Sequence, residues 1–210
     1  MTENRRRIAV LISGRGSNLQ ALIDAIAAGR LDAQIVLVIS NREDAPGLER
    51  ARAADIETLT VGHREFPTRA AFEDVLVQEL QSRDVSLVCL AGFMRLLGAT
   101  FLDAFPNAIL NVHPSLLPAF PGLDAQRQAW EYGTKIAGAT VHFVTGELDG
   151  GPIVRQTAVP VLDADTPDTL AARILEQEHR IYPEAVADVL AGGWTLEGRR
   201  FRPAGRTHRR

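Results

Sequence analysis

The sequence contains little that would support a disulfide, a metal cluster or a lysine-based mechanism. Its 210 residues include one cysteine, Cys89, and one lysine, Lys135. A single cysteine forms neither a disulfide nor a cysteine metal cluster within one chain, and the apolar run around Cys89 predicts a buried, inert thiol. A Schiff-base mechanism would have only Lys135 available, and the residues around it do not indicate a desolvated pocket.

Long hydrophobic runs are also missing. No apolar segment approaches the roughly 20 residues that span a bilayer, and Met1–Arg7 leads into a strand-like run without a cleavage-site pattern. Hydrophobic residues make up 46% and charged residues 23% of the chain, which is typical of a soluble globular domain. These features predict a cytoplasmic protein with no membrane association.

Charge is unevenly distributed along the chain. Six of the 23 basic residues are arginines in the last twelve positions, a segment without any acidic residue. Residues 1–198 contain the other 17 basic side chains and all 26 acidic ones. An acidic body is a poor ligand for phosphate backbones, so we expect no nucleic-acid partner. The basic tail, residues 199–210, is predicted to be solvated and disordered.

Apolar runs alternate with amphipathic stretches in the first half of the chain. Strands that are apolar throughout, separated by helices, are typical of a parallel sheet covered on both faces. The fold class predicted is therefore α/β, with a doubly wound, mostly parallel sheet flanked by helices. The predicted strands are Ile8–Ile12, Gln34–Ile39, Glu57–Val61, Leu87–Leu90 and Ala108–Val112, and the predicted helices are Asn18–Ala28, Gly47–Ala54, Thr68–Gln81 and Ala99–Phe105.

The second half is richer in β structure. Ile136–Thr145 and Ile153–Pro160 are longer strand-like runs joined by a glycine-rich turn. Asp165 or Thr166 is expected to cap a long helix that begins near Pro167 and runs to about Leu190. Pro183 is expected to bend or interrupt that helix.

A glycine-rich segment, Ser13–Asn18, follows the first strand and opens the first helix. Glycines let the backbone approach a ligand closely, and the amides at a helix start attract an anion. The segment matches neither a dinucleotide fingerprint nor a phosphate-binding Walker A loop. From these residues alone, a phosphate site and a plain strand-to-helix turn remain equally well supported.

Polar side chains follow the strand that ends near residue 112. Asn111 and His113 alternate onto the same side of that strand end, where an amide and an imidazole form a plausible pair for acyl transfer. Asp149 lies in a glycine-rich loop and would join them only if that loop folds over the strand ends. Ser115 lacks the flanking glycines of a nucleophile elbow.

One carboxylate falls on the apolar stripe of the long helix. A turn of 100° per residue places Glu178 among Leu170, Ile174 and Ile181, so it needs a partner, either an arginine or a ligand hydroxyl or amine. His179, next to it, is expected at the surface. The five histidines are dispersed and predict no metal site, and His142 is interpreted as a packed or supporting histidine.

Taken together, seven colinear segments resemble the phosphoribosylglycinamide formyltransferase family of folate-dependent enzymes in purine synthesis. The resemblance covers residues 8–195 without a missing block. The segments are Ile8–Gln20, Val38–Asn41, Leu90–Arg95, Leu110–Pro118, Val141–Val144, Glu147–Pro152 and Gln177–His179.

The resemblance implies formyl transfer from 10-formyltetrahydrofolate, as co-substrate, to the amine of glycinamide ribonucleotide, without a metal. It implies one formyltransferase domain over residues 1–198, with a nucleotide-binding half (1–112) and a folate-binding, catalytic half (113–198). His113, Asn111 and Asp149 would be catalytic. The ribonucleotide would contact Gly16, Ser17, Asn18 and Glu178, and the folate would contact Arg69, Met94, Arg95, Leu96, Leu97, Asn111, Thr145, Gly146, Glu147, Leu148 and Asp149.

Three alternatives stay open. A 10-formyltetrahydrofolate hydrolase and a methionyl-tRNA formyltransferase share the fold, but each carries an extra domain for which we expect no room beside seven leading residues and a short tail. A non-catalytic nucleotide-binding module would retain the Gly16 segment without needing Asn111, His113 and Asp149 together. We expect small-molecule substrates as partners and a monomer or weak homodimer.

Overall fold

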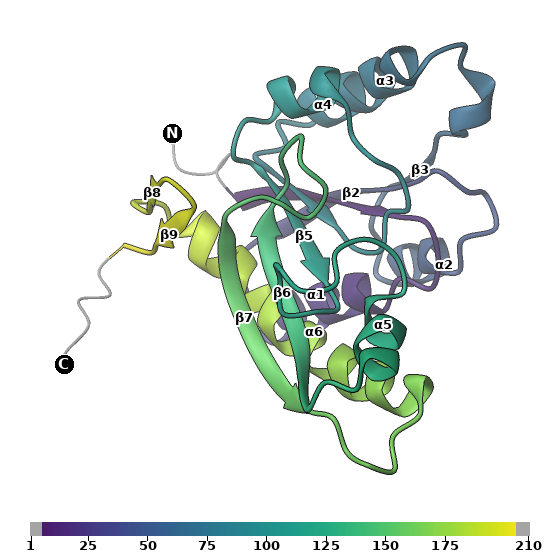
Figure 1. The fold of residues 1–210 in the computed structure, drawn as a ribbon. Coiled ribbons are helices and arrows are strands. Elements are labelled where there is room, and N and C mark those ends of the chain that lie inside the picture. Colours follow the sequence, from purple (N-terminus) through teal and green to yellow (C-terminus); the bar gives the residue numbers. More distant parts are fainter. Residues whose placement is uncertain (1–5, 205–210) are drawn as a thin grey trace.

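A nine-stranded sheet organises the structure in a computed structural model, which describes residues 6–204 (Figure 1). The strand order is β3-β2-β1-β4-β5-β6-β7-β9-β8. The strands are β1 (Arg7–Ile12), β2 (Gln34–Ser40), β3 (Thr58–Thr60), β4 (Leu87–Leu90), β5 (Ile109–His113), β6 (Ile136–Phe143), β7 (Ile153–Pro160), β8 (Thr195–Glu197) and β9 (Arg200–Arg202).

Strand direction changes in the middle of this sheet. Strands β3, β2, β1, β4 and β5 are parallel, as the run of apolar strands and intervening helices predicts. Strands β6 and β7 continue the sheet in antiparallel fashion from β5, with His113 opposite Thr140 and Leu110 opposite Phe143. The strand that carries Asn111 and His113 therefore has a parallel neighbour on one side and an antiparallel neighbour on the other.

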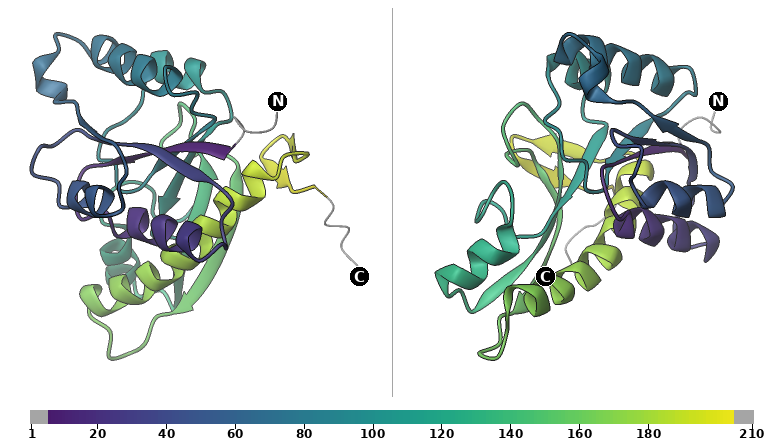
Figure 2. Two further views of the ribbon diagram at one scale, coloured as in Figure 1. Left: turned by 180° about the vertical axis from the view of Figure 1, so that it is seen from behind. Right: turned by 90° about the vertical axis from the view of Figure 1, so that its right-hand side faces the viewer.

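Helices cover both faces of the sheet (Figure 2). One apolar cluster packs α1, α2, α5 and α6 on one face, and a second packs α3 and α4 on the other. The doubly wound α/β class is thus confirmed. The helices are α1 (Ser17–Ala27), α2 (Gly47–Ala53), α3 (Arg69–Gln81), α4 (Ala99–Ala104), α5 (Ala125–Tyr132) and α6 (Pro167–Leu190), with a short 3-10 turn at His63–Glu65.

The long helix α6 begins where the sequence predicts. The Thr166 hydroxyl accepts a hydrogen bond from the Thr169 amide, and the Thr169 hydroxyl accepts one from the Thr166 amide. The two residues therefore form a reciprocal cap. Asp165 does not cap the helix and instead pairs with Arg173, 2.7 Å away. Pro183 is buried inside the helix and does not interrupt it.

Two elements differ from the sequence prediction. Helix α5 is not indicated by apolar periodicity, because Ala125 and Ala129 are its buried residues. The prediction of a disordered tail from residue 199 was wrong for its first part, because β9 takes up Arg200–Arg202 and pairs with β8. The prediction rested on the arginine content alone. The apolar side chains of Trp194, Leu196 and Phe201 pack against the core and order this segment. Residues 205–210 lie outside the described residues.

The strand order predicts a position for a ligand site. Strands β1 and β4 are neighbours, but the chain leaves β1 toward β2 and β3 before it crosses back to β4. In such sheets the carboxyl ends at this crossing point form the binding crevice. The loops after β1 and β4 and the end of β5 meet there. None of the helices within residues 6–204 is long and apolar enough to cross a membrane.

Candidate active site

Asn111 and His113 lie at the carboxyl end of β5, as the alternation of that strand predicts. The His113 side chain is buried, and Asn111 is partly exposed beside it. Their neighbours across the sheet are His142 and Thr140 of β6. Strand pairing therefore places a second histidine next to the amide of Asn111.

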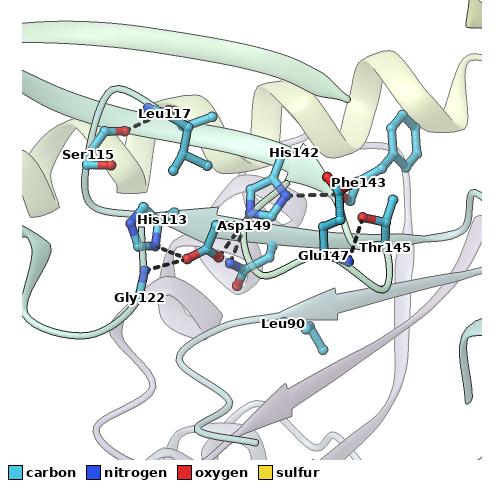
Figure 3. Close-up of polar contacts among 12 residues, drawn as sticks. Leu90, His113, Ser115, Leu117, Gly122, His142, Phe143, Thr145, Glu147 and Asp149 are labelled. Atoms are coloured by element: carbon cyan, nitrogen blue, oxygen red, sulfur yellow. Dashed lines mark hydrogen bonds and ion pairs between the residues drawn. The ribbon is translucent and has the colours of Figure 1, made fainter. Parts of the chain in front are cut away.

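The loop between β6 and β7 folds back over this strand end and brings Asp149 to both histidines (Figure 3). One carboxylate oxygen lies 3.5 Å from Nδ1 of His113, and the other lies 3.6 Å from Nε2 of His142. The Gly122 amide donates to Asp149 at 2.8 Å. The structure thus brings Asn111, His113 and Asp149 together, although His113 and Asp149 are 36 positions apart in the sequence.

Asp149 is held in its ionised form. Burial alone raises the pKa of this carboxyl, but the nearby His142 ring, the hydrogen bond from the Gly122 amide and the charge of His113 outweigh burial, so the net pKa lies below its usual value. Asp149 also adopts a left-handed backbone conformation, with φ 50°. The loop accepts that conformation while directing the carboxylate toward the two histidines.

The contacts of His113 suit a doubly protonated ring. Its Nε2 lies 2.9 Å from the carbonyl oxygen of Phe120, which accepts but does not donate, so this nitrogen carries a proton. Its Nδ1 faces the Asp149 carboxylate, which also accepts. An imidazolium satisfies both contacts, and an imidazolium is the form that donates a proton to a developing oxyanion.

His142 orients the Asn111 amide. Its Nδ1 donates to the Phe143 carbonyl at 2.8 Å, which leaves Nε2 of the neutral ring as an acceptor. The Asn111 amide nitrogen donates to that Nε2 at 3.2 Å and keeps a second N–H for a ligand. The interpretation of His142 as a supporting histidine fits these contacts, but its two specific partners were not foreseen.

The glycine-rich loop after β1 holds α1 with its first amides uncapped. Gly16 has φ +69°, and a Cβ there would lie 2.7 Å from Cα of Gly47 on α2. Arg50, also on α2, donates to the Arg15 carbonyl at 2.9 Å. No side chain caps α1, so its first amides lack a side-chain acceptor, and helix starts of this kind bind anions.

Asn18 and Glu178 form a buried pair beside this loop. The Asn18 amide donates to Glu178 at 2.7 Å, and the two side chains come from α1 and α6. Burial raises the pKa of Glu178 to about 7 against the opposing hydrogen bond from Asn18. The Asn18 carbonyl oxygen is buried and has no hydrogen-bond partner among the residues that the structure describes. The pair therefore offers a carboxylate and an unused acceptor to a ligand hydroxyl or amine.

Replacing Glu178 with glutamine is expected to stabilise the ligand-free protein at pH 8 by up to about 3 kcal/mol. The reason is that its pKa rises from 4.5 to about 7 on folding, so ionisation opposes folding increasingly between those values. Below pH 4.5 the gain should vanish. Urea unfolding at pH 4 and pH 8 measures the difference, and Glu176→Gln on the exposed side of α6 is the matched control.

The sequence resemblance implies that the same substitution raises KM for glycinamide ribonucleotide by about tenfold or more, with KM for a formyl donor changed less than twofold. The reason is that the substitution removes the hydrogen bond between the buried Glu178 carboxylate and the ribonucleotide, and no contact to the formyl donor. A larger effect on the formyl donor than on the ribonucleotide would contradict the assignment of Glu178.

The loop after β4 carries Met94 and Leu96, whose side chains are 66% and 64% exposed. Two buried groups hold its backbone. Ser13 accepts the Met94 amide at 2.8 Å while donating to Asn41 at 2.6 Å, and Glu73 of α3 accepts the Gly98 amide at 2.6 Å. The loop is therefore fixed at both ends while its apolar side chains face outward.

The other residues expected to contact folate lie around this loop. Arg69 begins α3, and its Cδ lies 3.4 Å from where a Cβ on Gly98 would be, which places it at the end of the Met94–Leu97 loop. Leu148 is 56% exposed on the loop that carries Asp149. Thr145 accepts the Glu147 amide at 3.4 Å on the same loop. Strand β5 separates β4 from β6, and the loop after β6 leaves beside Leu110 near the start of β5 and folds back until Asp149 reaches His113.

Sequence reasoning missed Ser13, Asn41, Glu73 and Arg50 as supports of these loops. Each partner lies at least 25 residues away in the sequence, and no local pattern reports such a contact. The division of the domain at residue 112 also does not divide the site, because Asn18 and Glu178 come from opposite halves.

Several other residues are removed from the chemistry. Ser115 donates to the Ala119 carbonyl at 2.6 Å and is buried. Burial raises the pKa of Cys89 to about 12, which makes the thiol inert as predicted. Lys135 is exposed and pairs with Asp163. His179 is partly buried, which corrects the expectation of a surface position. Within residues 6–204, no group of three or more His, Cys, Asp or Glu side chains forms a metal-binding cluster.

A family model described as formyl transferase matches residues 6–186 of the chain that forms this site. The chain belongs to the formyl transferase family. This formyl transferase is 46% identical over 192 residues to the phosphoribosylglycinamide formyltransferase of Escherichia coli (strain K12), covering 91% of this chain and 88% of that protein. The resemblance noted from the sequence is thereby confirmed.

Two further relatives are informative. The trifunctional purine biosynthetic protein adenosine-3 of Drosophila melanogaster is 47% identical over 194 residues, but the formyl transferase described here covers only 14% of its length. The crystal structure of glycinamide ribonucleotide transformylase 1 from Symbiobacterium toebii has a TM-score of 0.93 and 55% sequence identity, covering 96% of this chain and 95% of that chain. The fold therefore agrees over nearly the whole length of both chains.

Proposed function

We propose that this chain transfers the formyl group of 10-formyltetrahydrofolate to the amine of glycinamide ribonucleotide, giving formylglycinamide ribonucleotide and tetrahydrofolate. The observation that carries this proposal is the convergence of Asn111, His113 and Asp149 between two supported loops, next to the buried Asn18–Glu178 pair. Family membership and the printed names of the relatives support the same reaction.

The ribonucleotide is placed by the α1 side of the site. Its phosphate binds at Gly16, Ser17 and Asn18, where α1 begins without a side-chain cap. Glu178 accepts from a ribose hydroxyl or from the glycinamide end, which replaces the solvation that burial has removed. Since both groups are present before the ligand arrives, little ordering accompanies binding.

The formyl donor lies on the other side of β5. The exposed side chains of Met94, Leu96 and Leu148 supply apolar contact, and Arg69 lies at the end of the same loop. Arg95, Leu97 and the backbone of residues 145–149 complete the set that the family resemblance implies. This arrangement brings the formyl carbon next to Asn111 and His113.

The transfer itself needs no protein nucleophile. The substrate amine attacks the formyl carbon, and the carbonyl electron pair moves to oxygen. The free N–H of Asn111 and the N–H of His113 stabilise that oxyanion, while Asp149 keeps His113 charged and in place. Asp149 holds Nδ1 of His113. The Nε2–H of the same ring therefore moves its hydrogen bond from the Phe120 carbonyl to the substrate oxygen. When the intermediate collapses, the C–N bond to the folate breaks and its nitrogen takes up the proton lost by the amine.

The deciding experiment compares acceptors. Purified protein with a 10-formylfolate donor and no added metal is expected to consume the donor with glycinamide ribonucleotide, and not with water or methionyl-tRNA alone. Release of formate without an acceptor would identify a hydrolase. Ribonucleotide binding without turnover would identify a binding module.

The proposal extends to the setting of the reaction. We propose that the chain acts in the cytoplasm as a monomer or weak homodimer, with small-molecule substrates and without nucleic acid, membrane or metal. The acidic composition of residues 1–198 supports the absence of a nucleic-acid partner. Sedimentation of the purified protein with and without both substrates tests the oligomeric state.

A further inference from the structure

The C-terminal hairpin, residues 194–202, lies beside the loop that carries Asp149. It consists of β8 and β9 joined by a turn at Gly198, and it extends the sheet beyond β7 (Figure 1). The match to the formyl transferase family ends at residue 186, so the hairpin lies outside the region that the family model describes. It contacts the loop formed by residues 144–152 at one point and the two strand ends that flank this loop at two more.

The first contact is at the end of β6, where the loop begins. The ring of Phe143 lies 5.3 Å from that of Trp194 and 5.9 Å from that of Phe201, and the last two are 5.6 Å apart. Phe143 also closes the base of the loop, because its amide donates to the Pro152 carbonyl at 2.9 Å. The aromatic cluster therefore rests on the residue that joins the two ends of the loop.

The second contact is at the start of β7, where the loop ends. Ile153 pairs in parallel with Arg200 of β9. The third contact is on the loop itself, where Arg199 lies 3.4 Å from the carboxylate of Glu147. This ion pair is exposed and adds little by itself. A cavity of about 410 Å³ between the loop and the turn is lined by residues of both, Glu147 and Arg199 among them.

The loop has no comparable support from its own sequence. Three of its residues are glycine, and Leu148 is 56% exposed. Glycine-rich segments pay a high entropic cost for holding one conformation, so a fixed Asp149 needs external anchors at the ends of the loop. His142, the neighbour of Phe143 on β6, contacts Asp149 from the opposite face of the strand.

We propose that the C-terminal hairpin is a positioning element that holds loop 144–152, and with it Asp149, against His113 and His142. This inference rests on the proposed function for its kinetic consequence. The hairpin residues touch no reacting atom and act only through the loop. Phe201 is the residue that best represents the hairpin, since its ring contacts Phe143 and the adjacent Arg200 pairs with Ile153.

The test compares Phe201→Ala with Leu80→Ala. Leu80 is fully buried in the cluster on the other face of the sheet, so its loss lowers stability without touching the hairpin. Phe201→Ala is expected to lower kcat/KM for the formyl donor on the order of tenfold, because small displacements of catalytic groups are costly. KM for the ribonucleotide should change less than twofold. Leu80→Ala should change neither quantity at a temperature where it is folded.

Hydrogen exchange of the backbone amides in residues 144–152 gives a readout that does not depend on the activity. Exchange there is expected to be several-fold faster in Phe201→Ala and unchanged in Leu80→Ala. If both variants melt earlier but exchange in this loop stays as in the parent protein, the hairpin only adds stability and the inference is overturned. If the parent protein shows no formyl transfer but the loop still exchanges faster in Phe201→Ala, the positioning role stands and the proposed function fails. Should Phe201→Ala not fold, Phe201→Leu carries the same comparison.

Discussion

Replacing His113 with alanine is expected to lower kcat for formyl transfer by at least about 100-fold, with smaller changes in KM for either substrate. In the proposed mechanism His113 supplies an N–H to the oxyanion, and the Asp149 carboxylate, 3.5 Å from its Nδ1, holds the ring in place for that contact. That contact is realised in the transition state, so its loss affects kcat more than binding. Steady-state rates with each substrate varied in turn measure the effect.

Ser115→Ala is the matched control for that substitution. Ser115 lies two residues further along, and its hydroxyl is occupied by the Ala119 carbonyl. Its removal should cost about 1 kcal/mol of stability through the lost hydrogen bond and leave kcat within about threefold. A rate that survives the loss of His113, or falls with the loss of Ser115, would require a different mechanism.

Asp149→Asn is expected to lower kcat by about 100-fold as well. The carboxylate accepts a hydrogen bond from the Gly122 amide and lies 3.5 Å from Nδ1 of His113 and 3.6 Å from Nε2 of His142. An asparagine has one accepting oxygen and turns donor hydrogens toward one of these groups, so the imidazolium loses its counter-charge. Asp163→Asn, which changes an exposed carboxylate that pairs with Lys135, is the control and should retain most activity.

Acid titration gives a second check on Asp149. Its pKa is lowered on folding, so the carboxylate contributes stability above the usual value of 3.8, and that contribution disappears as the pH falls below it. The parent protein and Asp149→Asn should therefore differ in urea stability at pH 7 and converge toward pH 3. A constant difference across that range would mean that the substitution acts through packing alone.

Local patterns sufficed for the parts of the fold that repeat a short period. The apolar runs of β1 and β4, the strand-like run of β7 and the N-terminal cap of α6 are visible within a few residues, and so is the alternation that puts Asn111 and His113 on one side. The stripe on α6 also shows that Glu178 is buried and needs a partner. The identity of that partner, Asn18, depends on a contact across 160 positions.

Features that depend on distant packing were missed for the same reason. Glu73 appears in the sequence as one charged residue in a helix, yet the fold buries it under the Gly98 amide. The hairpin was hidden because its strands are three residues long and lie among arginines. The apolar character of Trp194 and Phe201 is explained by their ring contacts with Phe143, which is distant in the sequence.

The order of the strands has one more consequence, for the behaviour of the protein at high concentration. The sheet ends at β3 on one side and β8 on the other, and each of these edges is three residues long. Thr58 and Thr60 occupy one edge, and Thr195 and Glu197 occupy the other. Short polar edges present few unpaired backbone groups to a neighbouring chain, which disfavours aggregation through added strands.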